Sequence, residues 1–284
     1  MAGALLQSSK TPPTRLIDFH QHANYHGRDE AGLIRHQELL GATKTVLLPA
    51  GSQFGLAANV SGNSAALDLV RRHGTKFFFF ANELPDLPDT ITVLERYLRF
   101  GARGIGEQKY PVACDSEWIE RIASVARDYR VPVLMHFQHD AYNLGFPNFY
   151  KILDKFPSVN FIGHAQTWWG NIDAKHDQKV LYPEGPVTPG GLTDKWLSEY
   201  PNLYGDLSAG SGMRAMLRDE EFTKGFLDRH QDKLVFGSDC EDIDTTDRRC
   251  CGSRQLATLR RLAPSAAALD KIQYRNAAKL LKIS

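Results

Sequence analysis

Short, continuously apolar stretches recur along the chain at similar intervals. Most carry apolar residues at consecutive rather than alternating positions, which is the pattern of strands buried on both faces, as in a parallel sheet. The chain therefore predicts eight buried strands. They lie at residues 15–20, 44–50, 76–83, 102–109, 131–137, 159–165, 202–209 and 233–240.

Helical patterns fill most of the gaps between these runs. Apolar side chains at 115–130 recur at helical spacing and form one apolar face, and Asp115 or Ser116 can cap its start. Gly74 and Gly101 follow two further patterns, where a left-handed residue commonly ends a helix. The further helical patterns cover residues 63–74, 89–101, 148–157 and 265–283.

Strand and helix alternate with a regular period. The predicted strands begin at intervals of about 26 to 32 residues, with one longer interval of about 44 residues before the strand at 202. Eight such units predict an α/β protein with a (β/α)8 TIM barrel, in one domain over residues 15–284. A doubly wound open sheet is the alternative, but eight units favour closure. Residues 1–14 are interpreted as a flexible leader, which could have been trimmed from a longer precursor.

The long interval places an unusual segment after the sixth strand. Residues 166–201 are rich in Trp, Gly and Pro, which predicts an extended, ordered loop rather than a helix. Because it follows a strand, this loop is expected to cover the carboxyl end of the barrel, where the active sites of such barrels lie.

Composition excludes several classes of function. The 284-residue chain is 42% hydrophobic and has a formal charge of +1, so nucleic acid is not an expected partner. No apolar run approaches the roughly 20 residues needed to span a membrane, and the amino terminus lacks the features of a signal peptide. With four cysteines and no disulfide framework, a cytoplasmic location is expected.

The cysteines offer one minor alternative. Cys240, Cys250 and Cys251 fall close together in the sequence and could bind a soft metal. Zinc sites usually contain two spaced pairs of ligands, so this interpretation is not favoured over ordinary thiols.

Polar side chains follow the apolar parts of five predicted strands. His20 and His22 are two residues apart at the end of the first strand, so both face the same side. Six such groups in one buried layer would be costly to desolvate without a compensating centre, and imidazole and carboxylate ligands suit zinc, manganese or iron. The predicted ligands of a divalent metal, expected to be zinc, are His20, His22, Glu107, His136, His164 and Asp239.

These motifs resemble those of the amidohydrolase superfamily. The His-X-His pair, the strand-4 carboxylate, the histidines of strands 5 and 6 and the final aspartate match its pattern, and "RNAAKLLKI" is similar to the "GNAARLL" ending of its amidohydrolase-2 branch. The resemblance covers about residues 15–284. It implies a metal-dependent hydrolase in which metal-activated water attacks an ester, lactone or amide carbonyl.

The fourth predicted strand offers two alternative metal ligands. Glu107 and Lys109 are two residues apart and share a face, and relatives use either a carboxylate or a modified lysine there. Glu107 is favoured because it needs no modification, and Lys109 then becomes a contact for a substrate anion. The number of ions, one or two, also stays open.

The resemblance also implies roles in catalysis. Asp239 would accept a proton from water and pass it to the leaving group, and His164 would polarise the carbonyl, orient the substrate or bind a second metal. A small substrate, expected to be cyclic or carboxylated, would meet aromatic and cationic side chains around this layer. These candidates are Lys109, Tyr110, Gln166, Trp168, Trp169, Ser208 and Arg214.

Three other functions compete with hydrolysis. A non-oxidative decarboxylase or related lyase of the same branch needs the same metal. The stretch "GIGEQK" is similar to a motif of TatD-type nucleases, which suggests a phosphodiesterase, although the near-neutral charge argues against it. A barrel that only binds a ligand would not need all six positions filled. A homo-oligomeric state is left open.

Overall fold

All eight predicted strands are present in the computed structural model, which describes residues 15–51, 59–242 and 250–283. The predicted leader at 1–14 lies outside the described residues. Each strand falls within one of the apolar runs or extends it by one residue. The strands are β1 (Ile17–Gln21), β2 (Lys44–Leu47), β3 (Phe77–Phe79), β4 (Ile105–Gln108), β5 (Val133–His136), β6 (Phe161–His164), β7 (Leu203–Asp206) and β8 (Leu234–Val235).

The strands form a closed parallel barrel, so the predicted (β/α)8 fold is confirmed. Strands β1 to β3 pair in sequence order, and so do β4 to β8. The two groups meet at a bridge between Ala81 and Ile105, and the amide of Phe19 donates to the carbonyl of Phe236 at 3.0 Å, which joins β1 to the end of β8. Closure leaves no long unpaired edge among the described strands.

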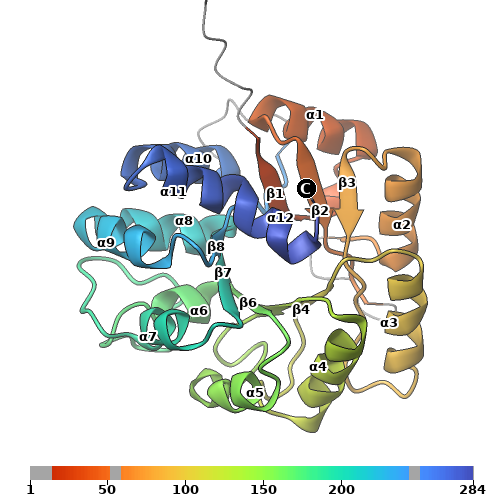
Figure 1. Ribbon diagram of the computed structural model, residues 1–284, viewed down its shortest axis with the longest axis horizontal. Helices are drawn as coiled ribbons and strands as arrows, with labels where there is room; N and C mark the ends of the chain where they lie inside the picture. Colours follow the sequence, from red (N-terminus) through yellow and green to blue (C-terminus); the bar gives the residue numbers. More distant parts are fainter. Residues whose placement is uncertain (1–14, 52–58, 243–249, 284) are drawn as a thin grey trace, which may run out of the picture.

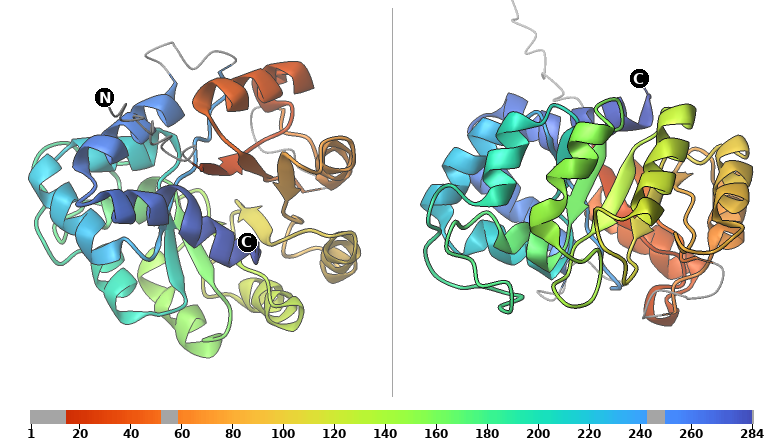
Figure 2. Two further views of the ribbon diagram at one scale, coloured as in Figure 1. Left: turned by 45° about the horizontal axis from the view of Figure 1, so that its top comes forward. Right: turned by 90° about the horizontal axis from the view of Figure 1, so that it is seen from below.

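Helices surround the strands, as the three views in Figures 1 and 2 show together. They are α1 (Glu30–Leu40), α2 (Asn63–Arg72), α3 (Thr90–Arg99), α4 (Glu117–Tyr129), α5 (Tyr150–Lys155), α6 (Gln166–Gly170), α7 (Leu192–Glu199), α8 (Ala209–Leu217), α9 (Glu220–His230), α10 (Cys251–Leu262), α11 (Ala266–Asp270) and α12 (Asn276–Leu281). Short turns η1 (Tyr25–Gly27), η2 (Phe146–Asn148) and the π-helical η3 (Lys271–Arg275) complete the elements.

The long segment after β6 differs from its prediction. Instead of an extended loop throughout, it contains α6 at its start and α7 near its end. Both helices are short and rich in residues that pack, since Trp168, Trp169 and Trp196 are all buried. Aromatic burial therefore outweighed the Gly and Pro content that predicted a loop.

Two details of the helix ends also differ from expectation. Ser116 is the N-cap residue of α4 but makes no side-chain cap, while Asp115 binds Lys151 instead. Gly101 is left-handed, with φ of 101°, as predicted after α3, whereas α2 ends at His73 and Gly74 is not left-handed.

The interior of the barrel is apolar toward its amino end. Ile17, Phe19, Phe80 and other strand residues pack there against α12, whose Leu280 and Leu281 belong to the same cluster. Figure 2 (left) shows this last helix lying across the strands. The opposite end of the barrel is thus left for polar side chains.

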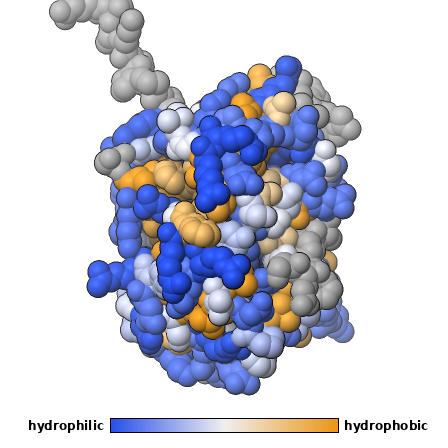
Figure 3. Space-filling view, turned by 90° about the vertical axis from the view of Figure 1, so that its right-hand side faces the viewer, coloured by the Kyte–Doolittle hydropathy of each residue, from blue (hydrophilic) through white to orange (hydrophobic). Residues whose placement is uncertain are grey.

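The outer surface is mainly polar. On the face that includes α2 and α3, hydrophilic side chains predominate and apolar ones are scattered (Figure 3). Among the described residues, every helix is too short or too polar to cross a bilayer.

Candidate metal centre

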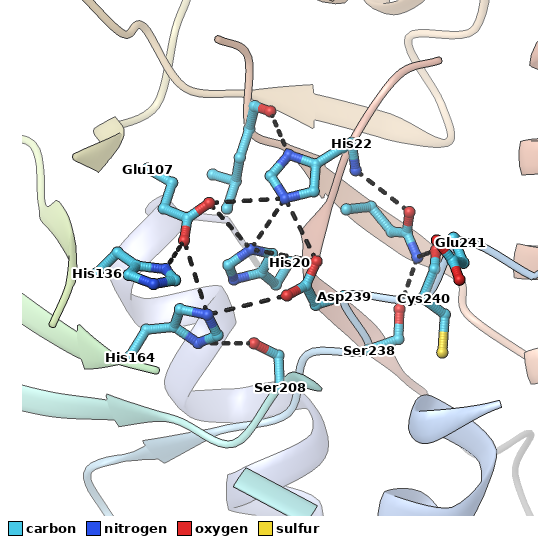
Figure 4. Close-up of polar contacts among 12 residues, drawn as sticks. His20, His22, Glu107, His136, His164, Ser208, Ser238, Asp239, Cys240 and Glu241 are labelled. Atoms are coloured by element: carbon cyan, nitrogen blue, oxygen red, sulfur yellow. Dashed lines mark hydrogen bonds and ion pairs between the residues drawn. The ribbon is translucent and has the colours of Figure 1, made fainter. Parts of the chain in front are cut away.

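The six predicted ligands lie together at the carboxyl end of the barrel, where Figure 4 shows them pointing toward one another. All are largely buried, and Asp239 is the most exposed, at 13% of its side chain. They come from β1 and the residue after it, from β4, β5 and β6, and from the segment after β8. They are His20, His22, Glu107, His136, His164 and Asp239.

Three of the histidines are held so that the same ring nitrogen faces the cluster. His20 Nδ1 donates to Asp206 Oδ2 at 2.7 Å, and His22 Nδ1 donates to a backbone carbonyl after β2, also at 2.7 Å. His164 Nδ1 lies 3.0 Å from the hydroxyl oxygen of Ser208, whose own proton goes to Asp206. With the proton on Nδ1, a neutral imidazole presents its Nε2 lone pair, which is the form that binds metal.

The distances inside the cluster fit one shared cation. The Nε2 atoms of His20 and His22 are 3.2 Å apart, and Asp239 Oδ1 lies 3.8 and 3.4 Å from them. Glu107 Oε2 is 3.7 Å from each of these nitrogens, and His164 Nε2 is 3.7 Å from Glu107 Oε1. Ligands bound about 2.0–2.2 Å from one zinc ion lie about 3–4 Å from each other.

Two features of this geometry are unfavourable without positive charge. Two imidazole lone pairs 3.2 Å apart repel unless a proton or cation lies between them. Asp239 Oδ1 is buried and makes no hydrogen bond to the described residues, although two ring nitrogens are near it. An unpartnered buried oxygen is costly, so the residues present fit a bound cation.

The electrostatics of the cluster support the same conclusion. Burial alone would raise the pKa of Asp239, but the nearby His20 and His22 outweigh burial and lower it to about 2. Burial would lower the pKa of His20, but the carboxylates of Asp239 and Asp206 outweigh burial and hold it well above its usual value. The carboxylates are therefore ionised and attract a positive charge to the point where the ligand atoms meet.

Glu107 and His136 form a pair at the edge of the cluster. His136 Nδ1 donates to Glu107 Oε1 at 2.5 Å, and its Nε2 faces Gln138 Oε1 at 3.4 Å. Burial lowers the pKa of His136 to about 4, despite the neighbouring carboxylate. The contacts of the His136 ring thus run to Glu107 and Gln138, and its role as a metal ligand stays a prediction.

The structure separates the two strand-4 candidates. Glu107 is 2% exposed and points into the cluster, whereas the ammonium of Lys109 lies 5.5 Å from the centre of the Tyr142 ring. The carboxylate thus lies among the predicted ligands, and the lysine is held beside an aromatic face.

The sequence interpretation missed two residues. Asp206 binds the rings of His20 and His164. Tyr25 lies close enough to Asp239 that this carboxylate raises the pKa of its hydroxyl, and its ring packs 4.9 Å from that of His22. Asp206 lies in a predicted strand run and two residues before Ser208, so the shared face was a usable signal. Tyr25 lies in a turn whose conformation no periodic pattern predicts.

Several predicted substrate contacts have other roles in the structure. Trp168 is fully buried and packs between Phe137 and Phe146, which accords with packing rather than with a pocket wall. Ser208 is also fully buried and holds His164 in place. Tyr110 is 5% exposed, and its backbone bonds to the following loop.

Three other predicted contacts lie together. Gln166, Trp169 and Arg214 line one small pocket with Tyr182. The guanidinium of Arg214 lies 5.0 Å from the centre of the Tyr182 ring, and Gln166 donates to the Tyr182 hydroxyl at 3.0 Å. Arg214 makes no ion pair with another described residue, and none of the six clustered residues lines this pocket. The guanidinium of Arg214 and the side-chain amide of Gln166 therefore lie beside the ring of Tyr182, where they could contact a ligand.

A family model described as Amidohydrolase (Amidohydro_2) matches residues 17–283. No curated protein sequence matches the chain.

Solved structures share the barrel at low sequence identity. A probable 2-pyrone-4,6-dicarboxylic acid hydrolase from Acinetobacter baumannii, with citric acid bound, has a TM-score of 0.64 and 13% identity, over 94% of this chain and 99% of that one. A 2,6-dihydroxybenzoate decarboxylase complexed with 2,6-dihydroxybenzoate gives 0.59 and 13%, over 95% and 100%. A 5-carboxyvanillate decarboxylase from Novosphingobium aromaticivorans, complexed with manganese and 4-hydroxy-3-methoxy-5-nitrobenzoic acid, gives 0.58 and 15%, over 88% and 79%. At these identities the similarity shows the fold alone.

Proposed function

Because the chain belongs to the amidohydrolase family, whose model matches residues 17–283, we propose that it is a metal-dependent hydrolase of a small ester, lactone or amide. The family resemblance that the sequence motifs predicted is thereby confirmed. The similar structures include both a hydrolase and decarboxylases, so the reaction type is the proposal. The observation that carries it is the unpartnered Asp239 carboxylate oxygen beside Nε2 atoms that face one point.

One divalent ion is the proposed cofactor, and zinc is the proposed metal. Two sets of three ligand atoms meet here, His20 with His22 and Asp239, and His20 with Glu107 and His164. Both sets contain His20, whose Nδ1 is bonded to Asp206, so only its Nε2 is left to bind an ion. Because one lone pair binds one ion, we assign the two sets to a single centre. Such an ion would acidify a water molecule and polarise a substrate carbonyl. Manganese, which one similar structure contains, is the alternative metal.

The protein's own groups then handle the protons. Asp239 is ionised at neutral pH, so its carboxylate accepts the proton of the attacking water and returns it to the leaving group. The hydroxyl of Tyr25 is close enough to feel the charge of that carboxylate, which raises its pKa, so it stays protonated beside the base. Asp206 holds the rings of His20 and His164, and His136 holds Glu107, so that the centre stays aligned.

The substrate is proposed to carry a carboxylate or a flat ring. Arg214 beside Tyr182 and Gln166 offers a charged donor, an amide and an aromatic face in one place. A carboxylate on the substrate would pair with the guanidinium, and a ring would lie against the tyrosine.

The metal requirement is tested by elemental analysis and by one variant pair. Chelation should abolish activity toward a responsive lactone or ester, and zinc or manganese should restore it. His22→Ala should lose metal and activity, whereas His73→Ala, on the outer end of α2, should keep both. Full activity in metal-free protein would contradict the proposal.

The reaction type is tested in ¹⁸O-labelled water. A hydrolase places one solvent oxygen in the product, and this label is the expected result. Release of carbon dioxide without label would instead establish the decarboxylase alternative. Cleavage of phosphodiesters alone, with no carbonyl substrate turned over, would favour the TatD-like reaction.

A further inference from the structure

A second group of metal-binding side chains lies in the protein, separate from the cluster of imidazoles. The side chains of His36, Cys240 and Cys250 bring one nitrogen and two sulfurs within 4.8 Å of one another. They come from α1, the segment after β8 and the start of α10. Figure 4 shows the sulfur of Cys240 directed away from the side where Asp239 meets the histidines.

We propose that His36, Cys240 and Cys250 bind a thiophilic divalent ion, zinc by ligand type, in a closed structural site. Cysteine thiolates with one histidine form a common ligand set for structural zinc. All three side chains are almost fully buried, at 0%, 2% and 0% exposure. A closed, buried site of this kind stabilises the fold and does not take part in the reaction.

The distances are close to those of a bound site. Cys240 Sγ and Cys250 Sγ are 3.2 Å apart, and His36 Nε2 lies 3.4 Å from Cys250 Sγ. With zinc–sulfur and zinc–nitrogen bonds of about 2.3 and 2.0 Å, a tetrahedral site separates its sulfurs by about 3.8 Å and a sulfur from a nitrogen by about 3.5 Å. The sulfurs need to part by roughly half an ångström to admit the ion.

The backbone around the thiols is arranged to stabilise thiolates. The amide of Gly252 donates to Cys240 Sγ at 3.0 Å, and the amide of Ser253 donates to Cys250 Sγ at 3.4 Å. Both amides belong to the first turn of α10, where the helix dipole also favours negative charge. Gly252 permits this approach, because a Cβ there would lie 2.5 Å from the Cβ of Ser238.

Further groups complete the surroundings of the site. The thiol of Cys251 hydrogen-bonds to Cys240 and is a thiol available for a fourth position. The buried guanidinium of Arg28 interacts electrostatically with Cys240 and offsets the negative charge that a thiolate-rich site carries.

The histidine is also held in a suitable orientation. The Gln37 amide contacts His36 Nδ1 at 3.0 Å, so Nε2 is the ring nitrogen that faces the sulfurs. Gln37 is itself held in place, because its nitrogen lies 3.0 Å from Asp18 Oδ2 and its oxygen accepts from Thr45 Oγ1 at 2.9 Å. The ring of His36 is therefore kept with Nε2 toward the two thiols.

The test uses cobalt as a spectroscopic probe in metal-depleted full-length protein. Cobalt bound by thiolates gives a sulfur-to-metal charge-transfer band in the near ultraviolet, which imidazole and carboxylate ligands do not give. The band is expected in the wild type and in His22→Ala, which lacks a ligand of the other cluster. It is also expected in Cys114→Ser, a matched control at a buried cysteine elsewhere in the fold. Cys250→Ser and Cys240→Ser should lose it and bind one ion fewer.

Three results would overturn the proposed thiolate site. A missing band in the wild type, or equal metal content in the wild type and Cys250→Ser, overturns the site whether or not the imidazole cluster binds metal. Thiol titration in denaturant covers the case in which the variants do not fold. If each chain binds one ion more than the imidazole cluster holds, a chelator in the denaturant should remove that ion. All four thiols of the chain should then react. Two reactive thiols that become four only after reduction would show a disulfide instead and overturn the proposal.

Discussion

The two ends of the barrel are built from the same strands but have opposite chemistry. At the carboxyl end, imidazoles and ionised carboxylates meet in a buried layer. At the amino end, apolar residues such as Phe19 and Leu281 pack against each other under α12. The apolar packing at the amino end stabilises the fold, whereas the buried charged groups at the carboxyl end serve the proposed reaction and destabilise the fold.

The contrast arises within individual strands. In β1, Ile17 and Phe19 belong to the apolar interior, yet His20, and His22 directly after the strand, reach the polar cluster. The register of β1 against β2 shifts between Asp18 and Gln21, which changes the face that successive side chains occupy. Substitutions at the two ends should therefore separate activity from stability.

The largest effect is expected at Asp239. Asp239→Asn keeps the shape of the side chain but removes the proposed base, and a general base contributes about 10²- to 10⁴-fold. We expect kcat to fall by at least about a hundredfold, with the melting temperature and most of the bound metal retained. Steady-state kinetics and elemental analysis of the same preparation measure both. Wild-type kcat in this variant would remove Asp239 from the mechanism.

The opposite result is expected at the amino end. Leu281 is 1% exposed, and Leu281→Ala leaves a cavity beneath α12, so the free energy of unfolding should fall by about 2–5 kcal/mol. The kcat of the folded fraction should stay unchanged. Urea denaturation measures the loss, and Leu39→Ala, at a residue 46% exposed, is the control with little effect. A large drop in kcat at Leu281 would mean that the two ends are coupled.

The strands and their polar ends could be predicted because each signal is local. A continuous apolar run marks a buried strand, and a histidine directly after it, such as His164, must lie at the carboxyl end. Long-range contacts left no such signal. His36 lies on a helix more than 200 residues from Cys240 and Cys250, so only the closed barrel brings the three together. The roles of Trp168 and Asp206 likewise depend on which neighbours the fold supplies.

A smaller effect is expected at Asp206, which touches two histidines of the cluster. Asp206→Asn weakens the bond that fixes the ring of His20, and loss of such a supporting carboxylate typically costs about 10- to 100-fold in metal affinity or activity. Metal titration and kcat should both change within that range. In a His20→Ala background the same substitution should add little, because its main partner is gone. Additive losses would show that Asp206 acts elsewhere.

The smallest effect is expected at a histidine–carboxylate pair outside the cluster. Asp194 on α7 contacts His230 Nε2 at 2.5 Å and Arg229 Nη2 at 2.8 Å. Burial opposes the charge of Asp194, but these two hydrogen bonds outweigh burial and hold its pKa below the usual value. Asp194→Asn should cost about 1 kcal/mol of unfolding free energy at neutral pH, without changing kcat.

The pH dependence of this loss follows from the direction of the pKa shift. A carboxylate with a lowered pKa stabilises the folded state fully above its unfolded pKa of about 3.9, and the contribution disappears as pH falls through the folded value. The difference between wild type and Asp194→Asn should therefore be constant from about pH 8 to pH 5 and shrink below about pH 4. Urea denaturation at several pH values measures it. If this difference in unfolding free energy grew as the pH fell, the pKa of Asp194 in the folded protein would be raised and not lowered. The contacts with His230 and Arg229 would then not be enough to keep the buried carboxylate ionised.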